Sequence, residues 1–170
     1  MADETGASQE ARPRVRNRVF LCVVDDTEEL HAALEFASLR AKRLPNTRVG
    51  IAYVIDAPAD FQHWAAVGDL MREEARDEAE QNLLRAASQV QRWSGKIPVV
   101  YVREGPMIDE LIALIQEDED VALLILGADV GPQGPGPLVS SLTGKQIGRL
   151  RVPLVIVPGN LSDEELESLA

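Results

Sequence analysis

The chain has 170 residues and a formal net charge of −11, because 28 Asp and Glu outnumber 17 Lys and Arg. This length favours one domain with a single core, and the acidic balance disfavours general binding to nucleic acid or to anionic lipid. The sequence has no apolar run of the roughly 18 residues that a membrane span needs, and its polar start lacks the apolar segment of a signal peptide. We therefore expect a cytoplasmic protein that binds neither nucleic acid nor membrane.

Five apolar runs alternate with helical patterns after a leader, residues 1–17, that has no periodicity and is predicted to be disordered. Asp26 or Thr27, followed by Glu29, has the spacing of a capping box before the first helical face. The longest helical pattern begins near Leu70 and ends near Gly95. The predicted strands are 19–24, 49–55, 97–102, 122–126 and 154–157.

This alternation predicts an α/β fold with a doubly wound, five-stranded parallel sheet. In such sheets ligands bind beyond the carboxyl ends of the strands, where the strand order reverses. We assign residues 18–159 to this domain and residues 160–170 to an acidic tail that forms no more than a frayed helix. The fifth strand closes the chain order and is apolar, so it is expected at a sheet edge that pairs with a second copy.

The glycine-rich and proline-rich loop after Gly127 is the first place to seek a ligand site. A strand that turns through glycines into a helix start can offer backbone N–H groups to a phosphate. Three prolines in this loop lack an N–H, however, and Asp129 adds a negative charge. Lys145, about one helical turn from the hydroxyls of Ser140 and Ser141, could reach a phosphate. The sequence alone therefore leaves open a phosphate cradle and a stiff loop that closes the sheet.

Cysteine and histidine carry little of the expected chemistry. Cys22 lies inside an apolar run, where a buried structural side chain is the favoured reading. His31 and His63 have no paired ligand spacing around them, so surface or packing roles are expected. We therefore predict no metal ligands and no catalytic residues.

Three features of the sequence carry a family resemblance. They are Val-Asp-Asp-Thr at 24–27, Tyr-Val-Ile-Asp at 53–56, and a pair of strands, of which one ends in Leu-Ile-Leu-Gly at 124–127 and the other begins with Arg-Val-Pro-Leu at 151–154. Over about residues 18–159 the chain thus resembles the universal stress protein family. The resemblance implies a parallel sheet in the order 3-2-1-4-5 with four flanking helices, of the adenine nucleotide alpha hydrolase type. It also implies a homodimer formed through the edge of the fifth strand.

Family members that hold ATP carry the pattern Gly, two residues, Gly, nine residues, Gly, then Ser or Thr. Here Gly127 and Ser141 keep the overall spacing. Val130 and Ser140 stand at the second and third Gly positions, and Gly131 comes one place late. The pattern is therefore kept in length and broken in its glycines.

The resemblance further implies that Asp25 receives an adenine while Val54 offers backbone groups to the same ring. A purely structural role for Asp25 would be to cap the following helix. The adenine end of the pocket is better kept than the phosphate end, so adenosine or a shorter nucleotide is favoured over ATP. The residues implied for an adenine-nucleotide cofactor are Asp25, Thr27, Val54, Gly127, Gly131, Gly134, Ser140, Ser141 and Leu142.

Two function classes remain open: a homodimeric stress-response regulator that senses an adenine nucleotide, and a nucleotide-independent interaction module. We expect no enzyme, because no general base is aimed at a water, although slow ATP hydrolysis stays open. A phosphorylated receiver domain would need an Asp at the end of the third strand and a Lys at the end of the fifth, and this chain has neither there. A P-loop fails because Gln146 follows Lys145, and a dinucleotide-binding fold fails because no glycines follow the first strand.

Overall fold

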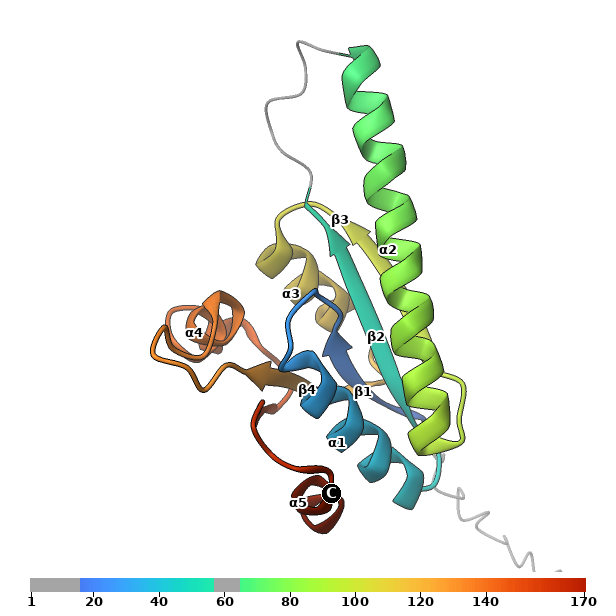
Figure 1. The fold of residues 1–170 in the computed structure, drawn as a ribbon, viewed down its shortest axis with the longest axis vertical. Coiled ribbons are helices and arrows are strands. Elements are labelled where there is room, and N and C mark those ends of the chain that lie inside the picture. Colours follow the sequence, from blue (N-terminus) through green and yellow to red (C-terminus); the bar gives the residue numbers. More distant parts are fainter. Residues whose placement is uncertain (1–15, 57–64) are drawn as a thin grey trace, which may run out of the picture.

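The computed structural model describes residues 16–56 and 65–170, so nearly all of the predicted leader, together with His63, lies outside the described residues. Five strands alternate with helices in chain order, coloured from blue to red in Figure 1. The strands are β1 (Arg18–Val23), β2 (Thr47–Ile55), β3 (Val99–Glu104), β4 (Val121–Ala128) and β5 (Leu154–Pro158). The helices are α1 (Leu30–Arg43), α2 (Ala65–Ser94), α3 (Met107–Glu117), α4 (Pro137–Thr143), the 3₁₀ turn η2 (Ile147–Arg149) and α5 (Asp163–Leu169).

All neighbouring strands pair in parallel, in the order β3-β2-β1-β4-β5. This confirms the predicted doubly wound sheet. The chain starts at the centre with β1, winds outward to β3, and then returns to β4 on the other side of β1. The order reverses between β1 and β4, so their carboxyl ends define the switch point at which ligands bind in such folds. β3 and β5 form the two edges.

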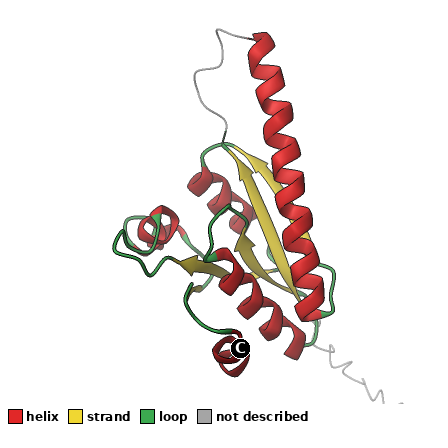
Figure 2. Ribbon diagram, in the orientation of Figure 1, coloured by secondary structure: helices red, strands yellow, loops and turns green. Residues whose placement is uncertain are grey.

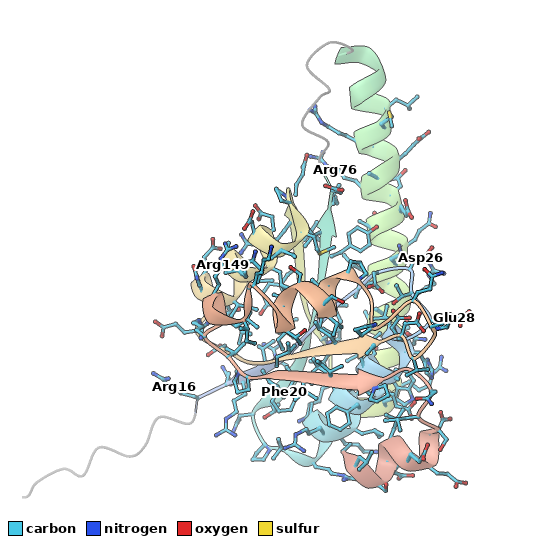
Figure 3. All side chains as sticks on the ribbon, turned by 90° about the vertical axis from the view of Figure 1, so that its left-hand side faces the viewer. Arg16, Phe20, Asp26, Glu28, Arg76 and Arg149 are labelled. Atoms are coloured by element: carbon cyan, nitrogen blue, oxygen red, sulfur yellow. The ribbon has the colours of Figure 1, made fainter. Side chains whose placement is uncertain are left out.

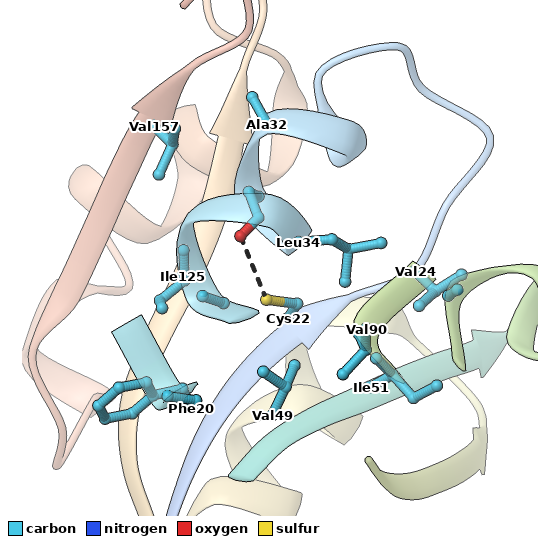
Figure 4. Close-up of a cluster of buried hydrophobic side chains, with 14 of the residues drawn as sticks. Phe20, Cys22, Val24, Ala32, Leu34, Val49, Ile51, Val90, Ile125 and Val157 are labelled. Carbon is cyan, nitrogen blue, oxygen red and sulfur yellow. Dashed lines mark hydrogen bonds between the residues drawn. The ribbon is translucent and has the colours of Figure 1, made fainter. Parts of the chain in front are cut away.

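Helices cover both faces of the sheet, as Figure 2 shows. Alternate residues of β1 point to opposite faces: Cys22 enters the core under α1, α2 and α5, whereas Leu21 enters the core under α3 and α4. Figure 4 shows the first core, where Cys22 lies among Val49, Ile51 and Ile125. Burial of the sheet on both faces explains the continuous apolar runs in the sequence. Among the described helices, none combines the length and the apolarity that a membrane span requires.

The start of α1 differs from the capping box predicted from the sequence. The helix begins at Leu30, its N-cap residue is Glu29, and no side chain caps it. Asp25 Oδ1 instead accepts hydrogen bonds from the backbone N and Oγ1 of Thr27, at 3.2 and 2.6 Å. The Asp side chain thus forms a local turn that competes with helix formation, and the helix begins three residues later. The role of Asp25 as a cap of this helix is therefore wrong.

The C-terminal segment is better ordered than the sequence predicts. Ser162 caps α5 with a complete capping box, because its side chain accepts from Glu165 N and its backbone N donates to the Glu165 carboxylate. Leu166 is fully buried in the core under α1. Arg43 donates to the carbonyl oxygens of Glu167 and Ala170, at 2.8 and 2.7 Å. The prediction of a frayed tail is wrong because one apolar anchor and these caps hold a helix that has little intrinsic stability.

Candidate functional site

The candidate site lies at the carboxyl ends of β1 and β4, between the β1–α1 loop and the β4–α4 loop. Two adjoining cavities occur there, with volumes of about 100 and 640 Å³. They share Thr27, Glu29, Gly136 and Pro137, and we call them together the carboxyl-end cleft. This is the position that the reversal of strand order predicts for a ligand.

One wall of the carboxyl-end cleft is the loop after β1. The hydrogen-bonded turn between Asp25 and Thr27 directs the chain away from the end of β1. The Asp25 side chain is only partly exposed. Its Oδ1 already accepts two hydrogen bonds within this turn, so the carboxylate holds the wall in place. Asp25 can act on a ligand and shape the loop at the same time.

The opposite wall is the loop from Asp129 to Gly136. Two of its backbone donors are engaged inside the loop: Gly131 N donates to Asp129 Oδ1 at 2.8 Å, and Gly134 N donates to Gly131 O at 3.2 Å. Gly134 and Gly136 have φ values of 89° and 93°, which side chains rarely adopt. The glycines therefore serve the path of the loop, and two of the N–H groups that a phosphate could use are already occupied within it.

The charges lining the carboxyl-end cleft are negative. Glu28, Glu29 and Asp129 line it together with Asp25, and its lining includes no Lys or Arg. Lys145 lies beyond the C-terminal end of α4, and Arg149 pairs with Asp109 at 2.9 Å. Figure 3 shows Asp26 and Glu28 at the carboxyl ends of the strands and Arg149 toward their amino ends. The cleft therefore repels a triphosphate more strongly than a ligand with little charge.

The structure brings together five of the nine residues predicted for the site. Asp25, Thr27, Gly127, Gly134 and Ser140 line the carboxyl-end cleft. The lining does not include Val54, Gly131, Ser141 or Leu142.

Burial explains the absence of two of these residues from the lining. Val54 and Leu142 are 5% and 0% exposed, and Leu142 packs in the core under α3 and α4. The Ser140 hydroxyl lines the cleft but donates to Gly136 O at 2.8 Å within α4. Sequence reasoning did not place Glu28 and Glu29 in the site, although the run of acids after β1 was a signal for both.

Two further cavities adjoin α2. A cavity of about 210 Å³ between the β1–α1 loop and α2 shares Asp25, Thr27 and Glu28 with the carboxyl-end cleft, and its lining also includes Asp26, His31, Asn82 and Arg85. The Arg85 guanidinium donates to Asn82 Oδ1 there. A more apolar groove of about 480 Å³ lies between α2 and the edge strand β3, and its lining includes Leu84, Val100 and Val102.

Cys22 has the structural role that its apolar surroundings indicate. The side chain is fully buried, and Sγ lies 3.9 Å from Ala33 O, marked by the dashed line in Figure 4. Burial raises the pKa of the Cys22 thiol from 9.0 to about 12. A protonated, inaccessible thiol is a poor nucleophile, so this residue offers no reactive group to the site.

Comparisons with solved structures give the same fold. The universal stress protein UspA from Lactobacillus plantarum is 17% identical, with 84% of this chain and 98% of that chain covered and a TM-score of 0.70. The universal stress protein from Archaeoglobus fulgidus is also 17% identical, with 84% and 99% covered and a TM-score of 0.62. A universal stress protein in complex with cAMP is 16% identical, with 82% and 96% covered and a TM-score of 0.60.

A search of curated proteins finds no match. The model of the universal stress protein family matches residues 16–158, which include all five strands and the carboxyl-end cleft. This chain therefore belongs to the universal stress protein family.

Proposed function

We propose that this protein is a stress-response regulator whose carboxyl-end cleft takes an adenosine ligand that carries at most one phosphate. The observation that carries the proposal is the set of carboxylates in the cleft, Glu28, Glu29 and Asp129, with no Lys or Arg in its lining. Charge repulsion of this kind penalises ATP far more than adenosine or a monophosphate. The structural neighbour in complex with cAMP, a ligand with one phosphate, supports the same ligand class.

The adenine end of the cleft suits such a ligand. Asp25 is partly exposed and lines the cleft beside Gly127, so its carboxylate can accept a hydrogen bond from an exocyclic amino group. The phosphate end is less suitable, because the N–H groups of Gly131 and Gly134 donate within the loop. Specificity would then come from exclusion of the triphosphate as much as from recognition of the base.

Calorimetry on protein freed of copurified ligand tests the proposal with adenosine, cAMP and ATP. We expect adenosine or cAMP to bind at least about tenfold more tightly than ATP, a difference of roughly 1.4 kcal/mol. Asp129→Asn removes one repelling charge and should reduce the difference in affinity between ATP and the less charged ligands. Glu119→Gln, an exposed site before β4 at the amino ends of the strands, is the matched control and should leave it unchanged. ATP binding as tight as that of adenosine would contradict the proposed selectivity.

The proposal includes a homodimer formed through the β5 edge. β5 has a neighbour on one side only, and Ile156 is 39% exposed. An apolar strand at a sheet edge offers unpaired backbone groups that a second copy can satisfy. Light scattering at micromolar concentration should give the mass of two chains, and Ile156→Lys should give the mass of one. A wild-type monomer under these conditions would remove the dimer from the proposal.

A second candidate function is a nucleotide-independent interaction module. It is favoured by the exposed apolar side chains Leu84, Val100 and Val102, which line the groove between α2 and β3. Exposed apolar patches of this kind often mark protein contacts. The calorimetric experiment separates the two functions. If adenosine, cAMP and ATP all give no binding heat at millimolar concentration, only the interaction module remains. Neither candidate includes a catalytic step.

A further inference from the structure

Glu35 is a buried carboxylate whose outer oxygen has no hydrogen-bond partner among the described residues. It lies in the middle of α1, and the residue is 6% exposed. No described donor reaches its Oε2 within hydrogen-bond distance, and His31 Nε2 lies 3.6 Å from this oxygen. A buried charged group without a partner costs free energy, so this oxygen calls for a positive ligand.

Two more metal-ligating groups converge on this oxygen from two elements. His31 lies one turn earlier on α1, and Asp163 is the first residue of α5. One ligand atom from each of the three residues lies within 4.8 Å of the others. We call His31, Glu35 and Asp163 the α1–α5 cluster. It lies outside the carboxyl-end cleft, whose lining contains none of the three residues.

Neighbouring contacts hold the α1–α5 cluster in place. The His31 ring meets the Trp93 ring edge to face, with the centroids 5.1 Å apart. The capping box of Ser162 positions Asp163, and the buried Leu166 anchors α5 under α1. The three ligands are therefore positioned by packing that does not depend on a bound ion, as an effective binding site requires.

The charges around Glu35 favour a cation. Burial and the carboxylate of Asp163 raise the pKa of Glu35, the imidazole of His31 lowers it, and the carboxylate of Glu167 raises it further. The Glu35 carboxylate thus lies within range of two further carboxylates and one imidazole. A divalent ion would neutralise this concentration of negative charge, whereas a bound anion would add to it.

We propose that His31, Glu35 and Asp163 bind a divalent metal ion of the zinc type. One imidazole nitrogen and two carboxylate oxygens form a ligand set that Zn²⁺ accepts, whereas Mg²⁺ and Ca²⁺ prefer oxygen alone. Bonds of about 2.1 Å in a tetrahedron place ligand atoms roughly 3.4 Å apart. The separation of 3.6 Å between His31 Nε2 and Glu35 Oε2 is close to that value.

The ion would join the C-terminal helix to α1 and leave a fourth position open to water, because His31 is 54% exposed. Its direct effect is to stabilise the docking of α5. The sequence signal for this site was the spacing His31-x-x-x-Glu35, which puts both ligands on one face of a helix. Asp163 comes from a distant part of the chain, so only the tertiary structure completes the set. The proposal departs from the expectation of no metal ligands.

Zinc titration of tag-free, chelator-treated protein tests the site, with calorimetry and Trp93 fluorescence as the two readouts. The chain has two tryptophans, so the titrations use a Trp64→Phe background in which Trp93 is the only tryptophan. We expect saturable binding of about one Zn²⁺ per chain. The emission of Trp93 should change as well, because the ion would bind the His31 imidazole that packs against the Trp93 ring. Mg²⁺ at the same concentration should produce neither signal.

Three variants decide whether the α1–α5 cluster holds the ion. Asp163→Asn and Glu35→Gln each remove one charged ligand at nearly constant shape and should weaken Zn²⁺ binding more than tenfold. Glu164→Gln removes the same charge at the next, exposed residue of α5 and should bind Zn²⁺ like the wild type. Zn²⁺ should also raise the Tm of the wild type and of Glu164→Gln, but not that of Glu35→Gln. Absence of saturable Zn²⁺ binding, or equal affinity in Asp163→Asn and the wild type, would overturn the proposal.

Discussion

A methyl group added at Gly127 would place its carbon 2.3 Å from the backbone carbonyl oxygen of Glu29. The end of β4 therefore touches the β1–α1 loop backbone to backbone, at the centre of the carboxyl-end cleft. The contact explains why this position takes glycine without any requirement for a positive φ. It also sets the separation of the two loops that form the walls of the cleft.

Gly127→Ala should destabilise the fold by about 1–3 kcal/mol, because a backbone carbonyl cannot move aside as a flexible side chain would. Gly148→Ala is the matched control, since its added methyl group would meet no atom within 4 Å. Urea unfolding of both variants measures the difference. Equal midpoints for the two variants would show that the β1–α1 loop relaxes around the added methyl group.

Lys96 is a second point at which distant segments meet. Its Nζ donates to the carbonyl oxygens of Ala41, Leu44 and Thr47, at 2.7, 3.0 and 3.0 Å. These bonds satisfy the C-terminal end of α1 and the start of β2. Lys96→Met should lower the free energy of unfolding by about 2 kcal/mol, because half-buried carbonyls lose a charged donor.

Lys42→Met is the control for Lys96→Met. It removes the same charge from the last turn of α1, but at an exposed side chain. Its effect on the free energy of unfolding should stay within about 0.5 kcal/mol. An equally large loss in both variants would mean that the charge near the helix end matters and the hydrogen bonds of Lys96 do not.

The Cys22 thiol should resist alkylation by iodoacetamide at pH 8 in the folded protein and react once the chain is unfolded in denaturant. Its pKa is about 12 in the fold, whereas the unfolded thiol ionises near 9.0. The folded state thus binds the proton more tightly, so this contribution to stability is complete below pH 9 and is lost as the pH rises toward 12. Fast alkylation of the native chain would contradict the buried position of the thiol.

The pH dependence of the free energy of unfolding, compared between the wild type and Cys22→Ala, provides a second measurement. Cys22→Ala should reduce the loss of stability between pH 9 and 12, because it removes a group that ionises only in the unfolded chain. Ionisation of this one thiol can lower the free energy of unfolding by at most about 1.4 kcal/mol per pH unit. Identical slopes for the wild type and the variant would contradict the assigned pKa.

Tyr101 should ionise well above the ordinary tyrosine range. Burial and the hydrogen bond from its hydroxyl to Asp118 Oδ2, at 2.7 Å, raise the pKa of the phenol. An ultraviolet titration should therefore show a late ionisation phase that is lost in Tyr101→Phe and kept in Tyr53→Phe. If the late phase disappears in Tyr53→Phe and stays in Tyr101→Phe, it belongs to Tyr53, and the prediction for Tyr101 is wrong. Asp118→Asn should move the phase to lower pH, because the hydroxyl loses a charged acceptor.

Local sequence predicted the β3 region with a shift of about two residues. The expected strand covered 97–102, whereas β3 covers Val99–Glu104. Pro98 cannot donate to a ladder, and the strand begins directly after it. At its other end, Arg103 and Glu104 pair with Val54 and Ile55 of β2, so the neighbouring strand extends β3 past the apolar run. Strand boundaries of this kind depend on pairing partners that are distant in sequence.

The sequence by itself determined the fold class, the strand order implied by the family resemblance, and the location of the cleft. It could do so because burial on both faces of a parallel sheet requires continuous apolar runs, and these are visible residue by residue. Only the tertiary structure decided which charges face the cleft and which side chains lie in the core instead, as with Leu142. It alone also brought Asp163 to His31 and Glu35. These outcomes depend on contacts between residues that are distant along the chain, and local patterns carry no information on such distances.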